Sequence, residues 1–493
     1  MNELPFEPGT LPGERPRSAR TVSGPPGPQK DLRSFLSYLE KHHPDELIRV
    51  RRKEVDPTWE VPAVIRRFQE DNKFPAVLFE RVKNSKLPVL TNLVASRVRL
   101  GATFETTVEN AMWEYTRRES QPIKPVMVSN GPVRDVKMIG DEVDLTKLPI
   151  CFHSEKDAGL YITPGLFFVK DPDTGVINCG MYRMMLKDKN TFGVSIGPHS
   201  HAAHIQHKYE SRGMDMPFVC ALGHHPALVL GTQARMSIDE SELDVMGGLL
   251  GEPVQLVPCE TVDLPVPAWA EIAIEGMLKA GVREPEAPFG EFTWYYGPQR
   301  NNPVLQVSAI TMRHDAIFHD LFSPYIEHNY CALLSMESVV YRRVKQTIPG
   351  LKAVVLPESG TCRFIAYLQM KKTFDGYGRN ACLAALAADP FIKIAVAVDE
   401  DINPYNEREV LWAIVTRSQP DRDWFFVPYS SVCRLIPSGY TYTSRVGGAR
   451  HEGDSMDTKV GIDATMPKEV PFYERSDVRR SDWEKIQLEE YLS

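Results

Sequence analysis

The stretch from about residue 136 to 320 constrains the fold most, because it consists of short apolar runs separated by Pro and Gly. Examples are YITPGLFFVKD, TFGVSIG, PALVLG, VQLVPCE, AEIAIEG and PVLQVSAITMR. Apolar runs of strand length bounded by turn residues are typical of strands. The stretch therefore predicts a large mixed sheet or a barrel.

Helix and strand alternate on both sides of this stretch. QKDLRSFLSYLEKHHP and EVPAVIRRFQED have apolar residues at helical spacing, and FPAVLFERV and LPVLTNLVAS follow as predicted strands. Beyond residue 325, ALLSMESVVYRRVKQTIPG predicts a helix that Pro349 and Gly350 end, before strands and helices alternate again. We expect an α/β protein of two or three domains, as its 493 residues also favour.

Composition excludes several classes of partner. The net charge of −8 argues against a nucleic acid or an anionic membrane, since both require a concentrated basic surface. No apolar run approaches the roughly 20 residues of a membrane span, and the N-terminus lacks a secretory signal pattern. Eight widely spaced cysteines without a C-x-x-C motif indicate reduced, mostly buried thiols. We expect a cytoplasmic protein.

PEAPFGEF, residues 285–292, carries two glutamates, Glu286 and Glu291. Pro288 and Gly290 disfavour a helix interior or a central strand, so only a folded loop could bring the two carboxylates together. Taken alone, the segment favours solvated acids on a surface turn over an acid–base site.

Other clusters are individually ambiguous. NCGMYR, residues 178–183, is a hairpin end or a backbone approach site, and GPHSHAAHIQH holds histidines that could be solvated or bind a metal. IDESELDVMGG is an acidic loop. An amide, an imidazole and a carboxylate drawn from these clusters would suit Mn²⁺ or Mg²⁺. Lys459 is either solvated or a phosphate ligand, and no Rossmann or P-loop motif occurs.

The order and spacing of these clusters resemble the UbiD family of reversible, prenylated-FMN-dependent decarboxylases. The matching motifs are T-P-G at 163–165, N-x-G-x-Y-R at 178–183, Gly193 to His201, S-E-L at 241–243, A-E-I-A-I-E-G at 270–276, P-E-x-P-F-G-E at 285–291 and K-V-x-x-D-A-T-M-P at 459–467. The resemblance spans nearly the whole chain from about residue 30.

The resemblance implies an α/β (α+β) fold with a flavin-reductase-like split β-barrel. The domain boundaries that we expect are a draped or disordered arm at 1–29, a prenylated-FMN-binding domain at 30–325, a linking helix at 326–350, a C-terminal α/β dimerisation domain at 351–435, and a tail at 436–493 that packs on the body or on a neighbouring subunit. It also implies a homodimer or a hexamer.

The resemblance further implies a cofactor site and a metal site. Asn178, His201 and Glu242 match the family's ligands for Mn²⁺ (or Mg²⁺), with K⁺ nearby, and the metal bridges to the phosphate of prenylated FMN. The residues expected to line the cofactor are Thr163, Asn178, Cys179, Gly180, Met181, Tyr182, Arg183, Ser200, His201, Glu242 and Lys459. A flavin prenyltransferase would supply the cofactor.

Arg183, Glu286 and Glu291 match the family's catalytic network. The resemblance implies that the substrate, an aromatic, heteroaromatic or α,β-unsaturated carboxylic acid, forms a covalent adduct with prenylated FMN and loses CO₂. Glu291 then protonates the carbon, while Arg183 orients the carboxylate and couples to Glu286. A carboxylic acid kept neutral beside a second carboxylate is a plausible proton donor.

Two residues depart from the family pattern. Ala287 and Trp294 stand where many members have Gly; Ala tolerates positive φ poorly, and Trp294 could either line the substrate pocket or pack in the core. Two alternative functions remain, an ordinary flavin oxidoreductase on a similar scaffold and an accessory subunit of a multi-subunit decarboxylase. The substrate's identity and the physiological direction are not predicted.

Overall fold

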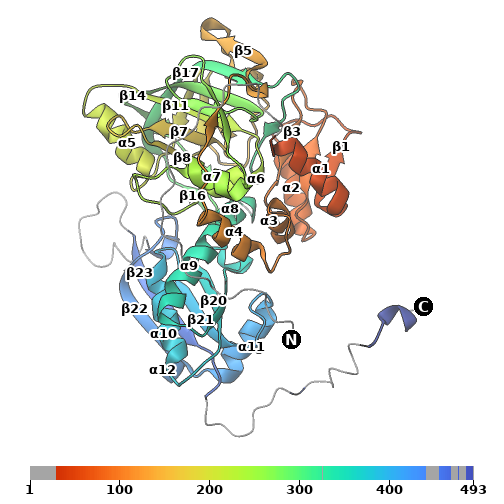
Figure 1. Ribbon diagram of the computed structural model, residues 1–493, viewed down its shortest axis with the longest axis vertical. Helices are drawn as coiled ribbons and strands as arrows, with labels where there is room; N and C mark the ends of the chain where they lie inside the picture. The colour runs from red at the N-terminus through yellow and green to blue at the C-terminus, as the bar shows by residue number, and fades with distance from the viewer. Residues whose placement is uncertain (1–28, 325, 440–454, 468–475, 477–484, 492–493) are drawn as a thin grey trace.

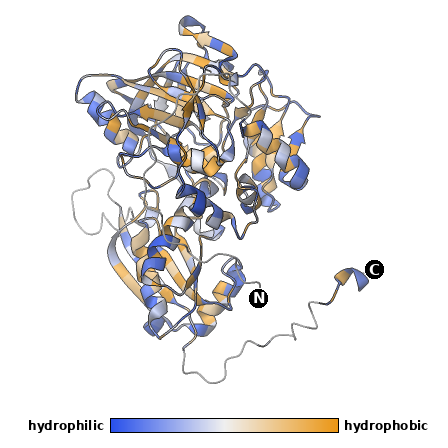
Figure 2. Cartoon of the chain, viewed as in Figure 1, coloured by the Kyte–Doolittle hydropathy of each residue, from blue (hydrophilic) through white to orange (hydrophobic). Residues whose placement is uncertain are grey.

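The computed structural model describes residues 29–324, 326–439, 455–467, 476 and 485–491. A larger body contains the N-terminal and central sheets, and a smaller one contains the C-terminal sheet, with α9 (Leu333–Thr347) between them (Figure 1). Apolar segments are concentrated in the strands, whereas the outer helices carry polar faces (Figure 2). Within the described residues, no helix is long and apolar enough to cross a lipid bilayer.

The N-terminal region packs helices around a four-stranded sheet of order β1-β2-β3-β18. Its elements are α1 (Leu32–His42), β1 (Leu47–Val50), α2 (Glu60–Glu70), β2 (Ala76–Phe79), β3 (Val89–Thr91), α3 (Arg97–Thr103), α4 (Ala111–Glu119) and the late strand β18 (Phe318–His319). Asp31 caps α1 by accepting the Ser34 amide, and the α1 residues with apolar helical spacing are buried. The predicted arm at 1–29 lies outside the described residues, apart from Gln29.

The central region is a nine-stranded sheet of order β6-β9-β10-β17-β14-β11-β7-β8, with β5 paired to β17. Its strands are β5 (Val136–Ile139), β6 (Tyr161–Ile162), β7 (Leu166–Lys170), β8 (Ile177–Met181), β9 (Met184–Asp188), β10 (Thr191–Val194), β11 (Met216–Leu222), β14 (Ile272–Glu286) and β17 (Arg300–Met312). Every pairing recorded in it is antiparallel.

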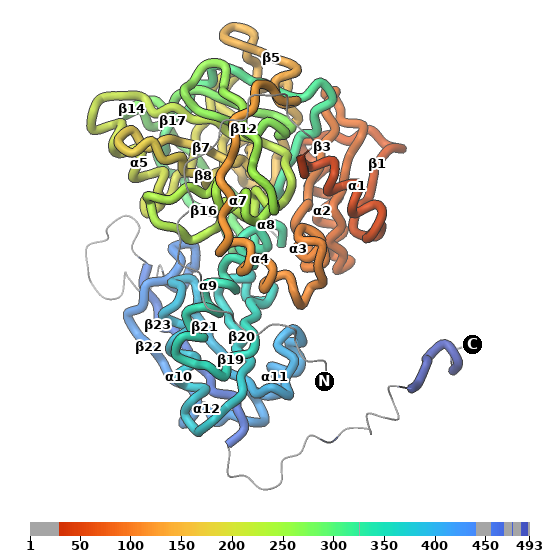
Figure 3. The backbone as a smooth tube through the Cα atoms, in the orientation of Figure 1, coloured from red at the N-terminus to blue at the C-terminus, as the bar shows by residue number. Residues whose placement is uncertain are grey.

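Smaller elements flank this sheet. They are β4 (Val126–Met127), α5 (His201–Glu210), α6 (Pro226–Gly231), α7 (Glu242–Leu250), β12 (Gln255–Pro258), β13 (Pro265–Pro267), β15 (Phe289–Gly290) and β16 (Tyr296–Gly297). In Figure 3, α1 and α2 lie on one side of the central body and α5 on the other.

The central sheet curls into a split barrel. β8 is the last strand in the order and β9 is the second, yet only Tyr182 and Arg183 join them. The Cα atoms of Met181 and Met184 are therefore at most about 11 Å apart, so the two ends of the sheet approach each other. The T-P-G link from β6 to β7, residues 163–165, crosses the same seam. This arrangement confirms the predicted fold class.

The C-terminal region is a five-stranded sheet of order β19-β20-β21-β23-β22. Its elements are α8 (Ile326–Cys331), α9, β19 (Leu351–Val355), β20 (Ile365–Met370), α10 (Tyr377–Ala388), β21 (Ile394–Asp399), α11 (Glu407–Arg417), α12 (Pro420–Asp423), β22 (Trp424–Ser431) and β23 (Met456–Asp463). The predicted linking helix is broken into α8 and α9 at Ala332. β23 lies inside the sheet between β21 and β22, so 456–463 belongs to this domain and not to the predicted tail.

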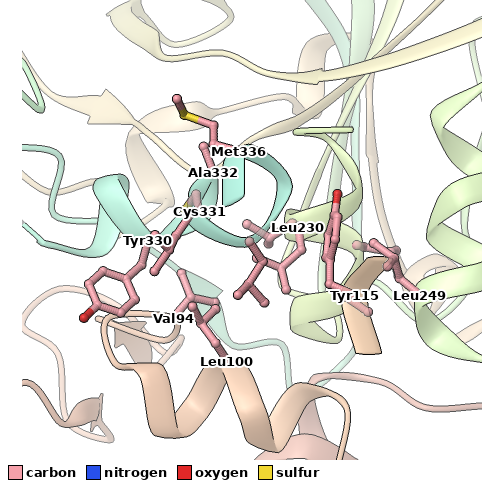
Figure 4. Close-up of a cluster of buried hydrophobic side chains, with 14 of the residues drawn as sticks. Val94, Leu100, Tyr115, Leu230, Leu249, Tyr330, Cys331, Ala332 and Met336 are labelled. Atoms are coloured by element: carbon pink, nitrogen blue, oxygen red, sulfur yellow. The ribbon is translucent and has the colours of Figure 1, made fainter. Parts of the chain in front are cut away.

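The largest core joins the N-terminal, central and C-terminal regions. Tyr330, Cys331, Ala332 and Met336 of α8 and α9 pack with side chains from α3, α4, α6 and α7 (Figure 4). Burial on this scale is the main source of stability and couples α8 to all three regions. All eight cysteines are free, and Cys259 alone among them is not fully buried.

Candidate active site

The side chains of Arg183, Glu286 and Glu291 meet at the barrel seam. Arg183 occupies the link between β8 and β9, and its Nε and Nη2 donate to the two oxygens of Glu286 at 2.9 and 3.0 Å. Its Nη1 donates to Oε1 of Glu291. Glu286 is fully buried and Glu291 is 8% exposed. One guanidinium thus binds two carboxylates, as the resemblance implied.

The catalytic loop, defined here as residues 286–297, reaches this position through two turns. Ala287 has φ of 73° and begins a cis peptide bond to Pro288, and Trp294 has φ of 65°. β15 follows the first turn, and the second turn joins it to its partner strand β16. The left-handed backbone at Ala287 and Trp294 explains why Gly suits both positions, and it resolves the two departures that the sequence left unexplained.

The guanidinium remains charged in this setting. Burial lowers the pKa of Arg183, but the charges of Glu291 and Glu286 outweigh that effect and raise the pKa above its ordinary value. The guanidinium also lies over the ring of Phe289, with 4.7 Å from Cζ to the ring centroid. Asn302 Nδ2 donates to Oε2 of Glu286 at 2.7 Å, so both oxygens of this buried acid are bonded.

A cavity of about 140 Å³ opens beside the trio. Its lining consists of Thr163, Met181, Tyr182, Arg183, Ser195, Phe289, Glu291, Leu321, Ser323 and His328. Burial, with a smaller contribution from Arg363 and Arg183, lowers the pKa of His328 to about 3, so its imidazole is neutral. Its Nδ1 lies 3.0 Å from Ser323 Oγ.

Asn178, Glu242 and His201 form a second group near the same seam. Asn178 Nδ2 donates to Oε1 of Glu242 at 2.8 Å, and the Cys179 amide donates to Oε2 at 2.8 Å. His201 Nδ1 lies 3.9 Å from Glu242 Oε1. Asn178 Oδ1 is buried and has no hydrogen-bond partner among the described residues. Burial raises the pKa of Glu242 to about 7.

This second group fits a divalent cation. The unpartnered amide oxygen, the carboxylate and the imidazole are the donor types that Mn²⁺ and Mg²⁺ accept. His201 and Glu242 are also the first residues of α5 and α7, so two helix N-termini converge on the group and favour an anion beside the metal. Elsewhere, the part of the chain that the structure describes has no cluster of three or more His, Cys, Asp or Glu side chains arranged to hold a metal ion.

Three segments of the chain match models of one protein family, the 3-octaprenyl-4-hydroxybenzoate carboxy-lyases. The N-terminal domain matches residues 38–118, the Rift-related domain residues 124–325, and the C-terminal domain residues 329–464. These models are those of the UbiD family, and together they cover most of the chain. The chain belongs to the UbiD family.

Known UbiD relatives are similar over nearly their whole length. The anhydromevalonate phosphate decarboxylase of Methanothermobacter thermautotrophicus is 35% identical over 88% of this chain and 97% of its own. The phenolic acid decarboxylase of Bacillus subtilis is 30% identical over 89% and 93%. The UbiD-class enzyme HmfF of Pelotomaculum thermopropionicum, solved with FMN, is 36% identical and superposes with a TM-score of 0.86 over 94% of this chain and 100% of its own. An evolved dimeric form of HmfF, solved with prenylated FMN, has a TM-score of 0.83. This protein is therefore a carboxy-lyase of the UbiD class.

Lys459, which the UbiD pattern assigns to the cofactor, belongs to β23 of the C-terminal sheet. Its buried Nζ donates to the carbonyl oxygens of Leu386 at 2.9 Å and Asp389 at 3.4 Å. These carbonyls lie at and just beyond the end of α10, where a cation is favourable. In this structure Lys459 therefore caps α10, and its contact with the cofactor stays a prediction. Ser200 caps α5 by accepting the Ala203 amide.

Sequence reasoning missed several members of the UbiD site. Phe289, Leu321, Ser323 and His328 line the cavity, and Asn302 binds Glu286. Phe289 lies inside the P-E-x-P-F-G-E motif, and Ser323 and His328 lie in the segment 323–332, which the family resemblance implies as a source of pocket residues without singling out either one. Nothing in the local pattern of Asn302 distinguished it from a turn residue.

Proposed function

We propose that this protein is a non-oxidative, reversible decarboxylase of an aromatic, heteroaromatic or α,β-unsaturated carboxylic acid that uses prenylated FMN. The observation that carries the proposal is the cluster of Arg183, Glu286 and Glu291 beside a cavity that Arg183 and Glu291 line. The FMN and prenylated FMN complexes of HmfF support the cofactor.

Arg183 binds the substrate carboxylate in this proposal. Its bonds to Glu286 and Glu291 use three of its N–H groups, and the remaining N–H groups would bind an incoming carboxylate. Glu286, held by Arg183 and Asn302, fixes the plane of the guanidinium. Glu286 is fully buried and does not reach the cavity, so it acts through Arg183.

Glu291 delivers the proton. The substrate adds a third negative charge to a buried group that holds two carboxylates and one guanidinium, so one acid is favoured in its neutral form. Glu291 lines the cavity, whereas Glu286 does not, which assigns the transferable proton to Glu291. After CO₂ departs, Glu291 protonates the carbon, and in the reverse direction it accepts that proton.

The seam holds the cofactor. Asn178, His201 and Glu242 would bind Mn²⁺ or Mg²⁺, with K⁺ nearby, and the metal together with the N-terminus of α5 would hold the phosphate. Thr163 and the segment from Asn178 to Arg183, with Cys179, Gly180, Met181 and Tyr182, would line the flavin, together with Ser200 and Lys459. Prenylated FMN, when bound, supplies the electron sink for the electron pair that CO₂ leaves.

The part of the cavity lining that would contact the substrate contains both apolar and polar side chains. Phe289 and Leu321 offer apolar surface, and Ser323 with the neutral His328 offers hydrogen bonds. Such a lining suits a flat acid with a polar substituent better than a second fully charged group. We further propose a cytoplasmic homodimer or hexamer that receives its cofactor from a flavin prenyltransferase.

The test is activity of the holoenzyme on a panel of acids. The protein is produced with a co-expressed flavin prenyltransferase, and CO₂ release is measured with hydroxybenzoic, furoic, cinnamic and phosphorylated acrylic acids. We expect release from at least one acid, deuterium at the former carboxyl position in D₂O, and no NADH or NADPH oxidation. Prenylated FMN bound to a protein that leaves every acid unchanged would contradict the proposal, and NADPH oxidation would favour an oxidoreductase.

A further inference from the structure

The catalytic loop lies between two cavities. Phe289 and Glu291 face the inner cavity beside Arg183. Gly290, with the following aromatic residues 294–296, faces an outer cavity of about 510 Å³. Trp294 is 69% exposed and Tyr295 57% exposed on that outer side. Buried packing of Phe289 and Phe292 holds the ends of the segment that contains Glu291, and hydrogen bonds orient the backbone between them.

One segment, residues 153–161, makes three hydrogen bonds to the loop backbone. The Ala287 amide donates to the Tyr161 hydroxyl at 3.2 Å, and the Ala158 amide donates to the Pro288 carbonyl at 2.9 Å. The Gly290 amide donates to Oδ1 of Asp157 at 2.8 Å. Gly290, whose amide donates to Asp157, directly precedes Glu291 in the chain.

Asp157 differs from Tyr161 and Ala158, which make the other two bonds to the loop, because it accepts through a carboxylate. It is 7% exposed, and its second oxygen accepts the Ser154 amide at 2.9 Å, which fixes the side chain in one orientation. Burial raises the pKa of Asp157, with Gly290, His153 and Ser154 acting in the opposite direction. Hydrogen bonds to an ionised acceptor are about twice as strong as those between neutral groups.

We propose that Asp157 is a positioning residue for the proton donor: through the Gly290 amide it fixes the distance between Glu291 and the substrate carbon. The proposal rests on the role of Glu291 proposed above. A displacement of about 1 Å at a reacting group costs on the order of 100-fold in rate, so a hydrogen bond that fixes this distance acts on turnover and not on substrate binding.

Asp157→Asn tests the proposal directly. The amide keeps the shape but turns one acceptor oxygen into a donor, so either the Gly290 or the Ser154 bond is lost. We expect kcat to fall at least tenfold, with KM changed less than about twofold and with unchanged flavin absorbance and metal content. A purely structural role would instead lower cofactor retention or raise KM.

Asp171→Asn is the matched control. Asp171 is also buried and also accepts two backbone amides, those of Asp173 at 2.8 Å and Thr174 at 3.3 Å, in a turn after β7. Its substitution should leave kcat within about twofold of the wild-type value. An equal loss of kcat in both variants would overturn the proposal, because it would show a general cost of removing a buried carboxylate.

A second pair of variants decides the matter if Asp157→Asn fails to fold. A Cβ at Gly290 would lie 2.6 Å from Ser154 Oγ and 3.2 Å from Ser154 Cβ. Gly290→Ala should therefore push the loop from residues 153–161 and lower kcat, and adding Ser154→Gly should restore much of it. Unchanged kcat in Gly290→Ala, or no recovery in the double variant, would count against the proposal.

Glu291→Gln, measured in parallel, separates the two levels of inference. If Glu291→Gln is inactive and Asp157→Asn has wild-type kcat, the positioning role of Asp157 is wrong and the catalytic assignment stands. If Glu291→Gln is itself fully active, the assignment of the proton donor is wrong, and the inference about Asp157 falls with it.

Discussion

Two hydrogen bonds of 2.9 and 3.0 Å join the guanidinium of Arg183 to the carboxylate of Glu286, parallel to each other and fully removed from solvent on the carboxylate side. This fork makes Glu286 part of the scaffold. Glu291 lines the cavity, so the two acids of the same loop have different surroundings and different roles.

Glu291→Gln should lower kcat at least 100-fold while flavin and metal remain bound. The amide keeps the volume and a hydrogen bond to Arg183 but has no proton to deliver at working pH. Single-turnover CO₂ release and the flavin spectrum measure the two effects separately. Loss of flavin in this variant would show that Glu291 serves cofactor binding instead.

Arg183→Lys should abolish catalysis and lower the free energy of unfolding. Lys cannot form the planar fork, so the fully buried Glu286 loses one of its bonds, which costs about 2–4 kcal/mol of unfolding free energy. Urea unfolding measures this loss. Arg283→Lys, which alters an ion pair with Glu210 at the surface, is the control and should change stability by less than about 0.5 kcal/mol.

Ala287→Gly should keep activity within about twofold, and Ala287→Val should lose at least tenfold. The φ of 73° suits Gly and is strained for a β-branched side chain, and the position is 2% exposed, so a larger side chain has no room. Steady-state rates of the two variants at equal flavin content check this. Equal activity of both would mean that the loop relaxes without cost.

His201→Ala should lower the content of divalent metal and of flavin in the purified protein. His207, in the same helix, is outside the group formed by Asn178, His201 and Glu242, so His207→Ala is the control and should retain both. Metal analysis and flavin absorbance give the readouts. Removing the metal from the wild type with a chelator should release flavin in the same proportion, because the proposed role of the metal is to hold the cofactor phosphate.

His319→Gln should make the protein less sensitive to acid. Burial lowers the pKa of His319 to about 4, so the folded protein keeps this imidazole neutral while the unfolded chain binds a proton below about pH 6.5. This contribution to stability is present at pH 7 and is lost as the pH falls from about 6.5 towards 4, at about 1.4 kcal/mol per pH unit.

Urea unfolding at pH 7 and pH 5 measures the difference. The wild type should lose about 2 kcal/mol more than His319→Gln over this interval. His314→Gln is the control, because the His314 side chain is 76% exposed. An equal acid loss in the wild type and in His319→Gln would contradict the buried, neutral state of His319.

The sequence predicted the fold class and most of the site because both depend on short-range patterns. Apolar runs bounded by Pro and Gly specify strands wherever they pair, and the motif that contains Glu286 and Glu291 carries its own turn residues. The resemblance brought Arg183 to these acids although they lie more than 100 positions away.

The remaining features depend on tertiary contacts that local pattern does not encode. β23 begins at Met456, far along the chain from the end of β22 at Ser431, so its place between β21 and β22 could not be read from spacing. Lys459 sits in a family motif, yet its amine bonds to α10 carbonyls that only the folded sheet brings near. Asn302 and Asp157 act through bonds to distant segments, and neither has a distinctive local motif.

Residues that would hold the cofactor and residues that would contact the rest of the substrate come from different parts of the chain. The short segment from Asn178 to Arg183 carries a proposed metal ligand at one end and, at the other, the arginine proposed to bind the substrate carboxylate. The surfaces that meet the rest of the acid come from elsewhere, in Phe289, Leu321, Ser323 and His328. After gene duplication, these four positions are free to diverge towards new acids while cofactor retention is inherited intact.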